Sequence, residues 1–443
     1  MNKYPTYKPS NIPWLGDVPE HWTAGRIKQL FQNIGSGTTP IAGTPKYYDD
    51  GTIPWVNTGD LNDGELYRCK KKITQIAFGE HSPLKLYEVD TLLIAMYGAT
   101  IGKAAILKFE ACTNQACCAL SKSKIADTKF VFYWFIANKQ NIIDLSYGGG
   151  QPNISQEIIR NLKLPLPPLP EQTQIVRYSD WQVSRIGKLI SAKKKQIALL
   201  KEQKQNIINA HLYGEKVMLK RLLLQPLQYG ANESGVEYSA DLPRYVRITD
   251  ISADGLLKTD KAKSLSSEKA KPYILKDGDI LLARSGATVG KSFLYQSKHG
   301  VCAFAGYLIM ARFNQKLILP QYFSYITNSS YYEQWKSTIF IQATIQNISA
   351  EKYYQFQIPL PSIEKQQEII KTLDKATAKI DLAIDNAERE IALINEYRIR
   401  LISDVVTGKV DVRGVDVPEF EPVEEIIDSS EDELIEEEME ETI

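Results

Sequence analysis

The sequence is poor in the side chains that build metal sites and disulfides, since its 443 residues include only five cysteines and four histidines. No two cysteines have the C-x-x-C spacing, and their odd number argues against a disulfide framework and for a reducing compartment. The histidines have neither helical spacing to one another nor a nearby cysteine or carboxylate; they are His21, His81, His211 and His299. We therefore expect neither metal ligation nor a Cys/His nucleophile.

Long apolar runs are also missing. The longer ones, such as residues 130–137, are far shorter than the ~18 residues that a membrane-spanning helix needs, so no membrane partner is expected. The N-terminus lacks the basic-then-apolar pattern of a signal peptide, and we expect a cytoplasmic protein. With 43% hydrophobic and 24% charged residues the composition is globular. The length suggests two to four folded units of roughly 100–200 residues each.

A net charge of zero conceals an uneven distribution of charge. Residues 419–443 contain 13 Asp and Glu and no Lys or Arg, which leaves 53 basic against 40 acidic residues in 1–418. A polar segment of one sign cannot bury a core, so a solvated acidic tail is expected. The remaining body is basic, which suits a polyanionic partner without requiring one.

Short sequence matches recur in the same order at a spacing of about 190 residues. They are G-A-T-x-G-K from Gly98 and from Gly286, N-I-S from Asn153 and from Asn347, P-L-P from Pro165 and from Pro359, Gln172 and Gln366, and Gly214 and Gly408. Self-similarity at a fixed spacing indicates an internal repeat, so we interpret the chain as a duplicated unit.

Each copy begins with about 130 residues of short β-prone runs, separated by Gly, Asn and Asp turns and followed by a short aromatic helix. The runs are 53–57, 92–96, 116–120, 245–249, 280–283 and 307–313, and the helices are 130–138 and 321–326. This pattern predicts a small mixed α/β domain that occurs twice.

After each small domain comes a proline segment, 164–170 or 358–363, which we interpret as a hinge. A long stretch poor in glycine and proline follows it, 171–213 or 365–407. At ~1.5 Å per residue, each stretch would form a helix roughly 63 Å long.

A heptad frame runs through both long stretches, with a positions every seven residues from Val176 and from Ile370. Seven of the ten a and d residues are apolar in the first stretch and eight of ten in the second. Since a lone helix of this kind would expose an apolar seam, we expect the two helices to pair antiparallel. Each should end near its glycine, Gly214 or Gly408. Two separate helices, each packed on its own domain, are the alternative.

The glycine stretches do not fit a nucleotide-binding P-loop, which requires G-x-x-x-x-G-K-[ST]. Their glycines are one residue too close, and Ala104 and Ser292 follow the two lysines. We do not expect nucleotide hydrolysis. Two interpretations stay open: a tight turn between strands, or a turn that offers backbone N–H groups, Thr and Lys to a nucleic-acid phosphate.

No catalytic site is predicted. Four cysteines lie in apolar strands and should be buried small hydrophobes: Cys112, Cys117, Cys118 and Cys302. Motifs such as G-x-S-x-G and H-E-x-x-H do not occur, so we expect no catalytic residue, no metal and no cofactor on this chain.

The duplicated order of small domain, P-L-P segment, glutamine and long helix resembles the specificity (S) subunit of Type I restriction–modification enzymes. The resemblance covers residues from about 20 to 412. The second copy departs from the first in having Glu364-Lys365 in place of Pro170-Glu171. The resemblance implies an α+β fold with two small mixed α/β target recognition domains. Two long antiparallel coiled-coil helices join them as a pseudo-two-fold internal repeat.

We assign the domains accordingly: an N-terminal segment 1–20, target recognition domain 1 at 21–156, a central hinge and long helix at 157–216, target recognition domain 2 at 217–350, a C-terminal hinge and long helix at 351–412, and an acidic, disordered tail at 413–443.

The resemblance also implies a subunit without catalytic activity, in which each domain reads one half of a split sequence in double-stranded DNA. Two modification subunits, which bind S-adenosylmethionine and methylate adenine, would dock on the helices. Restriction subunits would add cleavage that depends on ATP and Mg. These cofactors are therefore expected on the partner subunits.

Candidate DNA contacts are polar and basic side chains in the loops of the two domains, and for each of them an ordinary loop side chain is the alternative. In the first domain they are Thr38, Thr39, Lys46, Tyr47, Tyr48, Asn57, Thr58, Asp60, Tyr97, Thr100, Lys103 and Gln151; in the second they are Arg244, Arg247, Thr249, Asp250, Arg284, Thr288, Lys291, Gln342 and Thr344. The competing hypothesis for the whole chain is a non-catalytic coiled-coil protein scaffold without DNA specificity.

Overall fold

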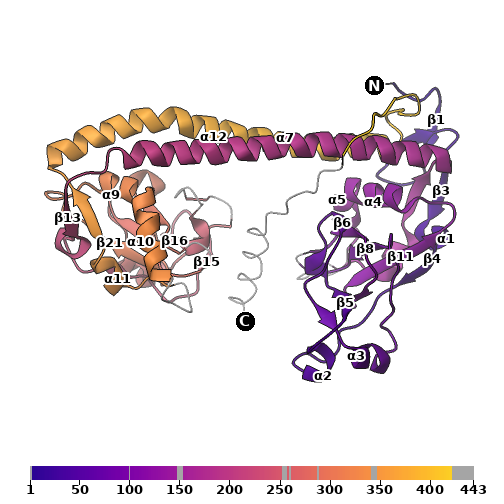
Figure 1. Ribbon diagram of the computed structural model, residues 1–443, viewed down its shortest axis with the longest axis horizontal. Coiled ribbons are helices and arrows are strands. Elements are labelled where there is room, and N and C mark those ends of the chain that lie inside the picture. The colour runs from indigo at the N-terminus through magenta and orange to yellow at the C-terminus, as the bar shows by residue number, and fades with distance from the viewer. Residues whose placement is uncertain are drawn as a thin grey trace. The chain divides into compact units, whose positions relative to one another are not determined.

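The computed structural model describes residues 2–98, 100–146, 153–251, 257–258, 261–286, 289–340 and 347–421. These residues form two compact units (Figure 1). Unit 1 comprises residues 2–192 and 389–421, and unit 2 comprises residues 193–388. Each unit thus contains one small domain and parts of both long helices, α7 (Leu169–Asn209) and α12 (Ile363–Val406).

Short strands and helices make up the rest of unit 1. They are β1 (Tyr7–Pro9), β2 (Asp17–Pro19), β3 (Thr23–Arg26), α1 (Ile27–Leu30), β4 (Phe31–Gly35), α2 (Pro45–Tyr48), β5 (Ile53–Val56), the 3-10 helix η1 (Thr58–Asp60), β6 (Gly64–Leu66), β7 (Lys72–Ile73), α3 (Gln75–Glu80), β8 (Leu92–Ala95), β9 (Ala104–Leu107), β10 (Cys112–Thr113), β11 (Cys117–Ser123), α4 (Thr128–Ala137), α5 (Lys139–Ile143), α6 (Gln156–Asn161) and β12 (Lys163–Leu166).

Unit 2 has a similar series of elements. They are β13 (Glu215–Met218), η2 (Leu219–Leu222), β14 (Gln228–Tyr229), β15 (Val236–Glu237), β16 (Arg244–Val246), η3 (Ile248–Asp250), β17 (Lys263–Ser264), α8 (Ser267–Ala270), η4 (Lys271–Tyr273), β18 (Ile280–Ala283), β19 (Ser292–Leu294), η5 (Ser297–His299), β20 (Cys302–Phe304), β21 (Leu308–Ala311), α9 (Pro320–Thr327), α10 (Ser330–Phe340), α11 (Ala350–Tyr354) and β22 (Gln357–Leu360).

The sheet topology repeats between the units. The order β4-β11-β8-β9-β6 in unit 1 corresponds to β14-β21-β18-β19 in unit 2, and β10-β5-β7 corresponds to β20-β16-β17-β15. A parallel pair occurs at the matching place in both copies, β5 with β10 and β16 with β20. A strand lies in each predicted β-prone run and a helix at each predicted aromatic helix, although the run 245–249 is a strand only to Val246 and continues into η3. The duplication is confirmed.

Strand periodicity explains how each main sheet is buried on both faces. Along β8, Leu92 and Ile94 face a core that includes α4, whereas Leu93 and Ala95 face a second core on the other side. The alternation recurs along β18, where Ile280 faces one core and Leu281 the other. Successive side chains of a strand point to opposite faces, so an uninterrupted apolar run fits a central, doubly covered strand.

The two proline segments are paired strands rather than open hinges. Strand β12 pairs antiparallel with β3, and β22 pairs antiparallel with β13, so each segment closes its own domain. Proline is tolerated here because each sheet has two strands and every strand is an edge. Gly214 does not end the helix as predicted, because α7 stops at Asn209. It allows the close approach of the paired strands, since a Cβ on Gly214 would lie 2.6 Å from the Leu360 carbonyl carbon.

A buried glutamine joins each long helix to its domain in the same way in both copies. Gln172 donates to the carbonyls of Pro167 and Ile125 and accepts from the Asp127 N–H, at 2.7–3.1 Å. In unit 2, Gln366 donates to Pro361 and Leu317 and accepts from the Leu319 N–H, at 2.8–3.0 Å. Both side chains are fully buried. The glutamine of the repeat therefore satisfies three backbone groups that would otherwise be buried without partners.

The heptad frame correctly identifies the buried face of both helices. All twenty a and d positions belong to the described residues, and none of their side chains is exposed. In unit 2, Lys204 bonds Asp381 at 2.6 Å and Lys201 lies 3.7 Å from Glu388, so α7 and α12 run antiparallel there. Lys204 is the cation at an a position, and its ion pair explains why a charge is tolerated in the seam.

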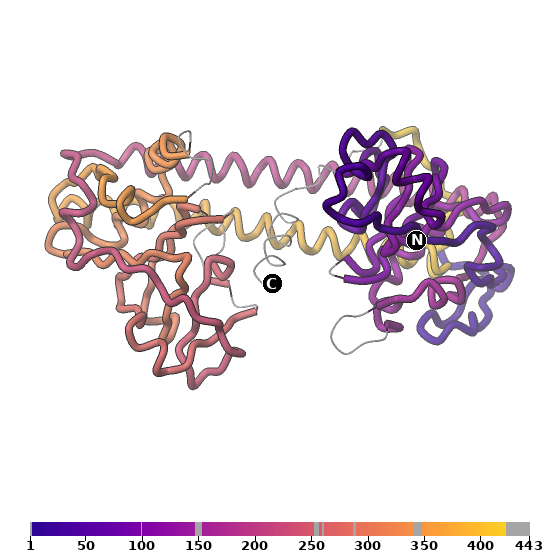
Figure 2. The backbone as a smooth tube through the Cα atoms, turned by 90° about the horizontal axis from the view of Figure 1, so that it is seen from below, coloured from indigo at the N-terminus to yellow at the C-terminus, as the bar shows by residue number. Residues whose placement is uncertain are grey.

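The chain after α12 returns to the N-terminal elements within unit 1 (Figure 2). Asn2 bridges Asp411, and the side chains of Gln174, Arg177 and Ser184 on α7 donate to backbone carbonyls between residues 412 and 421 at 2.6–3.0 Å. Residues 413–421, which we expected to belong to a solvated tail, therefore lie along α7. Residues 422–443 of the predicted tail lie outside the described residues.

Glu171 explains where the two copies diverge at the start of the long helix. Its buried carboxylate accepts hydrogen bonds from Tyr4 (2.7 Å) and Trp22 (2.9 Å) and lies 2.7 Å from His21 Nε2. The matching Lys365 is exposed and pairs with Glu368. Only the first copy has an N-terminal segment to hold at this point, which accounts for the different residue.

A charged network links the first small domain to α7. Lys129 of α4 bonds Glu65 of β6 at 2.9 Å and Asp180 of α7 at 3.0 Å, while Tyr133 donates to Asp180 at 2.5 Å. Burial alone would raise the pKa of Glu65, but hydrogen bonds from Lys129 and Tyr67 outweigh it and lower this pKa to about 2. Burial raises the pKa of Asp180. Glu65 is therefore ionised in the folded protein throughout the neutral and mildly acidic range.

The Gln366→Leu substitution tests the buried glutamine. It leaves two carbonyls and one N–H without partners, and we expect the free energy of unfolding of the full chain to fall by about 1–3 kcal/mol in urea titration. The adjacent Gln367 is exposed, so Gln367→Leu should change stability little. Equal effects of the two substitutions would contradict this role.

The Glu65→Gln substitution tests the charged network through its pH dependence. Because the folded-state pKa of Glu65 is depressed, its ionisation stabilises the fold above its ordinary pKa near 4.5, and this contribution is lost as the pH falls toward 2. We expect the variant to be less stable than the parent by on the order of 1–3 kcal/mol at pH 7, with the difference shrinking between pH 4.5 and 2.5. Glu88→Gln, at an exposed carboxylate, is the matched control. A pH-independent difference would show that ionisation of Glu65 is not involved.

Candidate nucleic-acid interface

Three segments that are distant in sequence meet at one edge of the small domain in unit 1. The Asn114 N–H donates to Val56 at the end of β5 (3.0 Å), and the Met96 N–H donates to Ala116 (2.9 Å). The Met96 carbonyl accepts from the Ile154 N–H at 2.8 Å. We call this the turn edge of unit 1; it comprises residues 57, 96–103 (except 99), 114–116 and 153–154.

The same hydrogen-bond ladder recurs in unit 2. The Ala305 N–H donates to Val246 (3.0 Å), the Arg284 N–H donates to Tyr307 (3.0 Å), and the Arg284 carbonyl accepts from the Ile348 N–H (2.8 Å). The turn edge of unit 2 comprises residues 247, 284–286, 289–291, 305–307 and 347–348. The G-A-T-x-G-K and N-I-S stretches that reveal the repeat are thus neighbours in space in both copies.

Several N–H groups of the glycine turn are bonded within the hairpin. In unit 1 the N–H groups of Ile101, Gly102 and Lys103 donate to carbonyls of the same hairpin at 2.9–3.1 Å, and in unit 2 the N–H groups of Val289 and Gly290 do so at 2.8–3.0 Å. These N–H groups are therefore not available to a phosphate, and both interpretations of the turn stay predictions.

Close packing explains the second glycine of the turn. Gly290 has φ +80°, and a Cβ there would lie 2.2 Å from Cδ of Lys336 on α10. The hydroxyl of Tyr332, also on α10, donates to the Gly290 carbonyl at 2.9 Å. Any other residue would be strained at this φ and would displace the Lys336 side chain, which explains the glycine.

Two predicted tyrosine contacts are structural residues. Tyr47 is 7% exposed, packs in a core with Trp55, and donates its hydroxyl to Glu80 at 2.7 Å. Tyr48 donates to the Pro40 carbonyl at 2.6 Å and packs against Trp55. Each hydroxyl is therefore engaged within the domain, and the assignment of both tyrosines as DNA contacts stays a prediction.

The rest of that loop offers more accessible groups. Thr39 is exposed and donates to the exposed Gln115 side chain at 2.6 Å. Thr38 is half-buried, and its carbonyl accepts from the Trp55 indole. Lys46 is exposed, but it pairs with Glu80 at 2.8 Å. The Thr39–Gln115 pair joins this loop to the turn edge.

The predicted carboxylate contacts are also structural. Asp60 accepts from the N–H groups of Asn57 (2.8 Å) and Lys70 (3.1 Å), which caps η1. Asp250 is 2% exposed and accepts from the N–H of Arg247 (2.8 Å) and from its guanidinium (2.9 and 3.2 Å). Asp60 and Asp250 thus have a structural role, since the two copies use the same Asp to fix the loop after β5 or β16. Their assignment as DNA contacts, like that of Arg247, stays a prediction.

The remaining candidates are half-buried side chains at or beside the turn edges: Asn57, Thr58, Tyr97, Thr100, Lys103, Arg244, Thr249, Arg284 and Lys291. Arg244 already donates to the Lys258 carbonyl. Burial raises the pKa of Tyr97, which keeps its phenol a hydrogen-bond donor at neutral pH. Gln151, Thr288, Gln342 and Thr344 lie outside the described residues.

Sequence reasoning missed two side chains at this surface. Gln115 is exposed at the turn edge of unit 1, and Tyr229 of β14 lies beneath the Arg284 guanidinium, whose carbon is 5.0 Å from the ring centroid. Gln115 lies between two predicted strands, and that position could have indicated an exposed loop. Nothing in the sequence brings Tyr229 to Arg284, because 54 residues separate them.

The groups that could perform catalysis are inert where the structure describes them. Burial raises the pKa of Cys112 and of Cys118 to about 12, so these thiols are neutral at pH 7 and poor nucleophiles. Cys117 and Cys302 are buried as well, which confirms the prediction of small hydrophobic residues. Among the described residues no group of three or more His, Cys, Asp or Glu could hold a metal ion. No helix of the described part is long and apolar enough to span a membrane.

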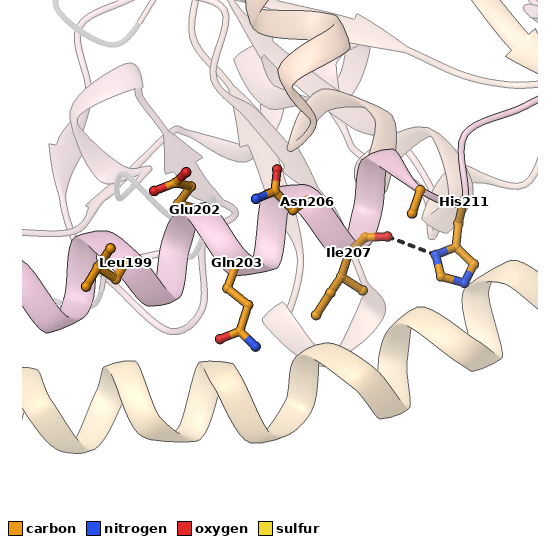
Figure 3. A pocket seen from close by; sticks show the side chains of 7 residues that line it. Leu199, Glu202, Gln203, Asn206, Ile207 and His211 are labelled. Atoms are coloured by element: carbon orange, nitrogen blue, oxygen red, sulfur yellow. Dashed lines mark hydrogen bonds between the residues drawn. The ribbon is translucent and has the colours of Figure 1, made fainter.

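A hollow on unit 2 does not resemble a small-molecule site. It is lined by α7 and the turn after it, from Leu199 to His211. Gln203 and Ile207 point toward α12, Glu202 points away from it, and His211 Nδ1 lies 2.8 Å from the Ile207 carbonyl (Figure 3). The hollow therefore lacks the convergent polar groups of a ligand pocket.

Comparisons with known proteins show one consistent likeness. A family profile described as "Type I restriction modification DNA specificity domain" matches residues 19–179 and 178–391. The Type I restriction enzyme MjaVIII specificity subunit of Methanocaldococcus jannaschii is 23% identical over 435 residues, which cover 90% of this chain and 95% of that protein. The EcoKI specificity subunit of Escherichia coli is 21% identical over 430 residues, covering 89% and 90%.

The fold is also similar to a solved structure. A chain from work on the "structural basis underlying complex assembly and conformational transition of the type I R-M system" has a TM-score of 0.57 at 16% identity. The match covers 89% of this chain and 99% of that one.

The Asp250→Ala substitution tests the structural role of the carboxylate. It removes the cap of η3 and leaves Arg247 without its partner, so we expect the free energy of unfolding to fall by about 1–3 kcal/mol in urea titration of the full chain. Asp241→Ala, at an exposed position nine residues earlier, should have little effect. Unchanged stability combined with weaker DNA binding would restore Asp250 as a DNA contact.

Proposed function

Since the chain belongs to the family of Type I restriction modification DNA specificity domains, we propose that it reads a DNA target in two halves, one with each copy of its duplicated domain. Its role is DNA target recognition as the specificity subunit of a Type I restriction–modification system, and catalysis belongs to other subunits of such systems. The two-half reading is supported above all by the turn edge, which both units build with the same ladder.

The chemistry of the turn edges suits base reading. Unit 1 brings Asn57, Tyr97 and Gln115 to its edge, whereas unit 2 brings Arg284, since Asp250 already holds the Arg247 guanidinium. Amide and guanidinium groups are the side chains that form paired hydrogen bonds with base edges in the major groove. The lysines at matching positions of the glycine turns suit sequence-independent phosphate contact. The two edges therefore share a frame and differ in the groups that can distinguish bases.

We assign the target recognition domains to residues 21–156 and 217–350 and the docking of partners to the long helices. Two modification subunits would bind S-adenosylmethionine and methylate adenine, and restriction subunits would use ATP and Mg. Exposed apolar side chains on both helices, such as Leu199 (66%) and Leu393 (64%), support a role in protein contacts.

Exchanging residues 217–350 for those of a relative tests the division into two readers. Methylated adenines mapped in a host that carries the hybrid with its modification subunits should show one half-site changed and the other preserved. The physical reason is that each turn edge is completed within its own unit. Simultaneous change of both half-sites would refute separate readers.

Binding to duplex DNA separates this function from a protein scaffold. The complex with modification subunits should bind random duplexes with an affinity that falls steeply with salt, because lysine and arginine contacts to phosphates release counterions. A complex that assembles but does not bind DNA at low salt would favour the scaffold.

A further inference from the structure

One backbone position of the turn edge carries different side chains in the two units. Arg284 directly precedes the glycine turn of unit 2, and Met96 precedes that of unit 1, 188 residues earlier. Both residues donate their N–H across the edge at 2.9–3.0 Å and accept at their carbonyl from the N-I-S isoleucine at 2.8 Å. The same place in the same ladder therefore holds a guanidinium in one copy and an apolar thioether in the other.

Among the residues that the structure describes, the Arg284 guanidinium contacts an aromatic ring and no carboxylate. Its central carbon lies 5.0 Å from the centroid of the Tyr229 ring, and its buried Nε has no hydrogen-bond partner among the described residues. Other arginines of the described part are neutralised within the fold: Arg247 by Asp250, Arg312 by Asp279, and Arg413 by Asp411. Within the described part of the chain, Arg284 therefore lies over a tyrosine ring and forms no ion pair.

Tyr229 is itself fixed at both ends. Its backbone pairs with Ile309 of β21, and its hydroxyl accepts from the Ala350 N–H at 3.1 Å. An arginine stacked on such a ring keeps its planar fork in one orientation while the edge of the fork remains available for hydrogen bonds. This is the geometry needed to meet two acceptors lying side by side.

The difference between the copies indicates which acceptors these are. Every base pair carries the same phosphates, so a cation serving phosphate contact is expected in both copies, as Lys103 and Lys291 are. A position that is arginine in one copy and methionine in the other is instead expected to distinguish the two half-sites. The side-by-side acceptors that arginine recognises in DNA are O6 and N7 of guanine.

We propose that Arg284 reads a guanine in the half-site recognised by unit 2, through O6 and N7 in the major groove, with Tyr229 as its positioning residue. The inference rests on the proposed function and deepens it by assigning a base class to one residue. The half-site of unit 1 has no guanine reader at the equivalent position, because Met96 occupies it.

The test compares the full chain with Arg284→Met, the side chain of the other copy, each in complex with its modification subunits. Mapping of methylated adenines gives both half-sites, and binding is then measured to duplexes carrying each base pair at every position of the unit 2 half-site. The parent should prefer one guanine by about 10- to 100-fold, and the variant should lose this preference while keeping every other position. Replacing that guanine with 7-deazaguanine, which lacks the N7 acceptor, should weaken the parent and not the variant.

Further variants separate base reading from other roles. Tyr229→Ala should reduce the preference at the same single base pair, and Tyr229→Phe should retain it. Lys316→Met, which removes an exposed charge in the same unit, should leave all base preferences unchanged. The unaltered half-site of unit 1 shows that each variant is folded.

The outcomes are distinguishable. If Arg284→Met weakens binding equally to all sequences and lowers the salt dependence, Arg284 contacts a phosphate and the inference is wrong. If it changes no base preference, or alters the other half-site, the inference is also wrong, although two-half recognition stands. If the parent complex recognises no split target at all, the proposed function itself fails.

Discussion

Each unit completes its core with parts of both long helices, and the rest of the structure depends on this sharing. In unit 1, Ile175 and Tyr178 of α7 share a core with Ile402 and Val405 of α12. In unit 2, Ile208 of α7 lies in one core with Ile369 and Leu373 of α12. The core of unit 1 thus includes residues from the far end of the chain, and that of unit 2 joins helix residues from before and after its small domain, so both cores form through contacts of large sequence separation.

The duplication divides residues into those that build the frame and those that distinguish the copies. The buried glutamine, the second glycine of the turn and the capping aspartate make the same bonds in both units, which explains why they recur in the sequence. Residues that differ at equivalent positions of the turn edge, such as Met96 and Arg284, leave that ladder unchanged. A common scaffold can therefore carry different base-reading chemistry in its two halves.

Periodic features could be predicted from the sequence because they depend on local geometry. The heptad frame fixes the buried face of both helices, and the continuous apolar run 92–96 predicts a strand that the structure buries on both faces. Other features depend on tertiary partners. Tyr47 and Asp60 look like ligand-binding loop residues, but Glu80 and the Lys70 N–H already engage them.

Contacts between segments that are distant in sequence also limited the prediction of individual residue roles. Gly214 matches Gly408 in the repeat, yet it is required by the close approach of β22 and not by the end of a helix. The stacking of Arg284 on Tyr229 joins residues that no spacing rule connects. The conformation of each loop decides which polar groups already form hydrogen bonds within the protein, and this conformation is visible only in the structure.

Genome-wide detection of methylated adenine, in a host that carries this chain with its modification subunits, tests the central claim most directly. Two readers built on one shared helical frame predict a split target: two short half-sites separated by a gap of fixed length and unspecified sequence. A single uninterrupted target, or half-sites whose separation varies freely, would contradict the account.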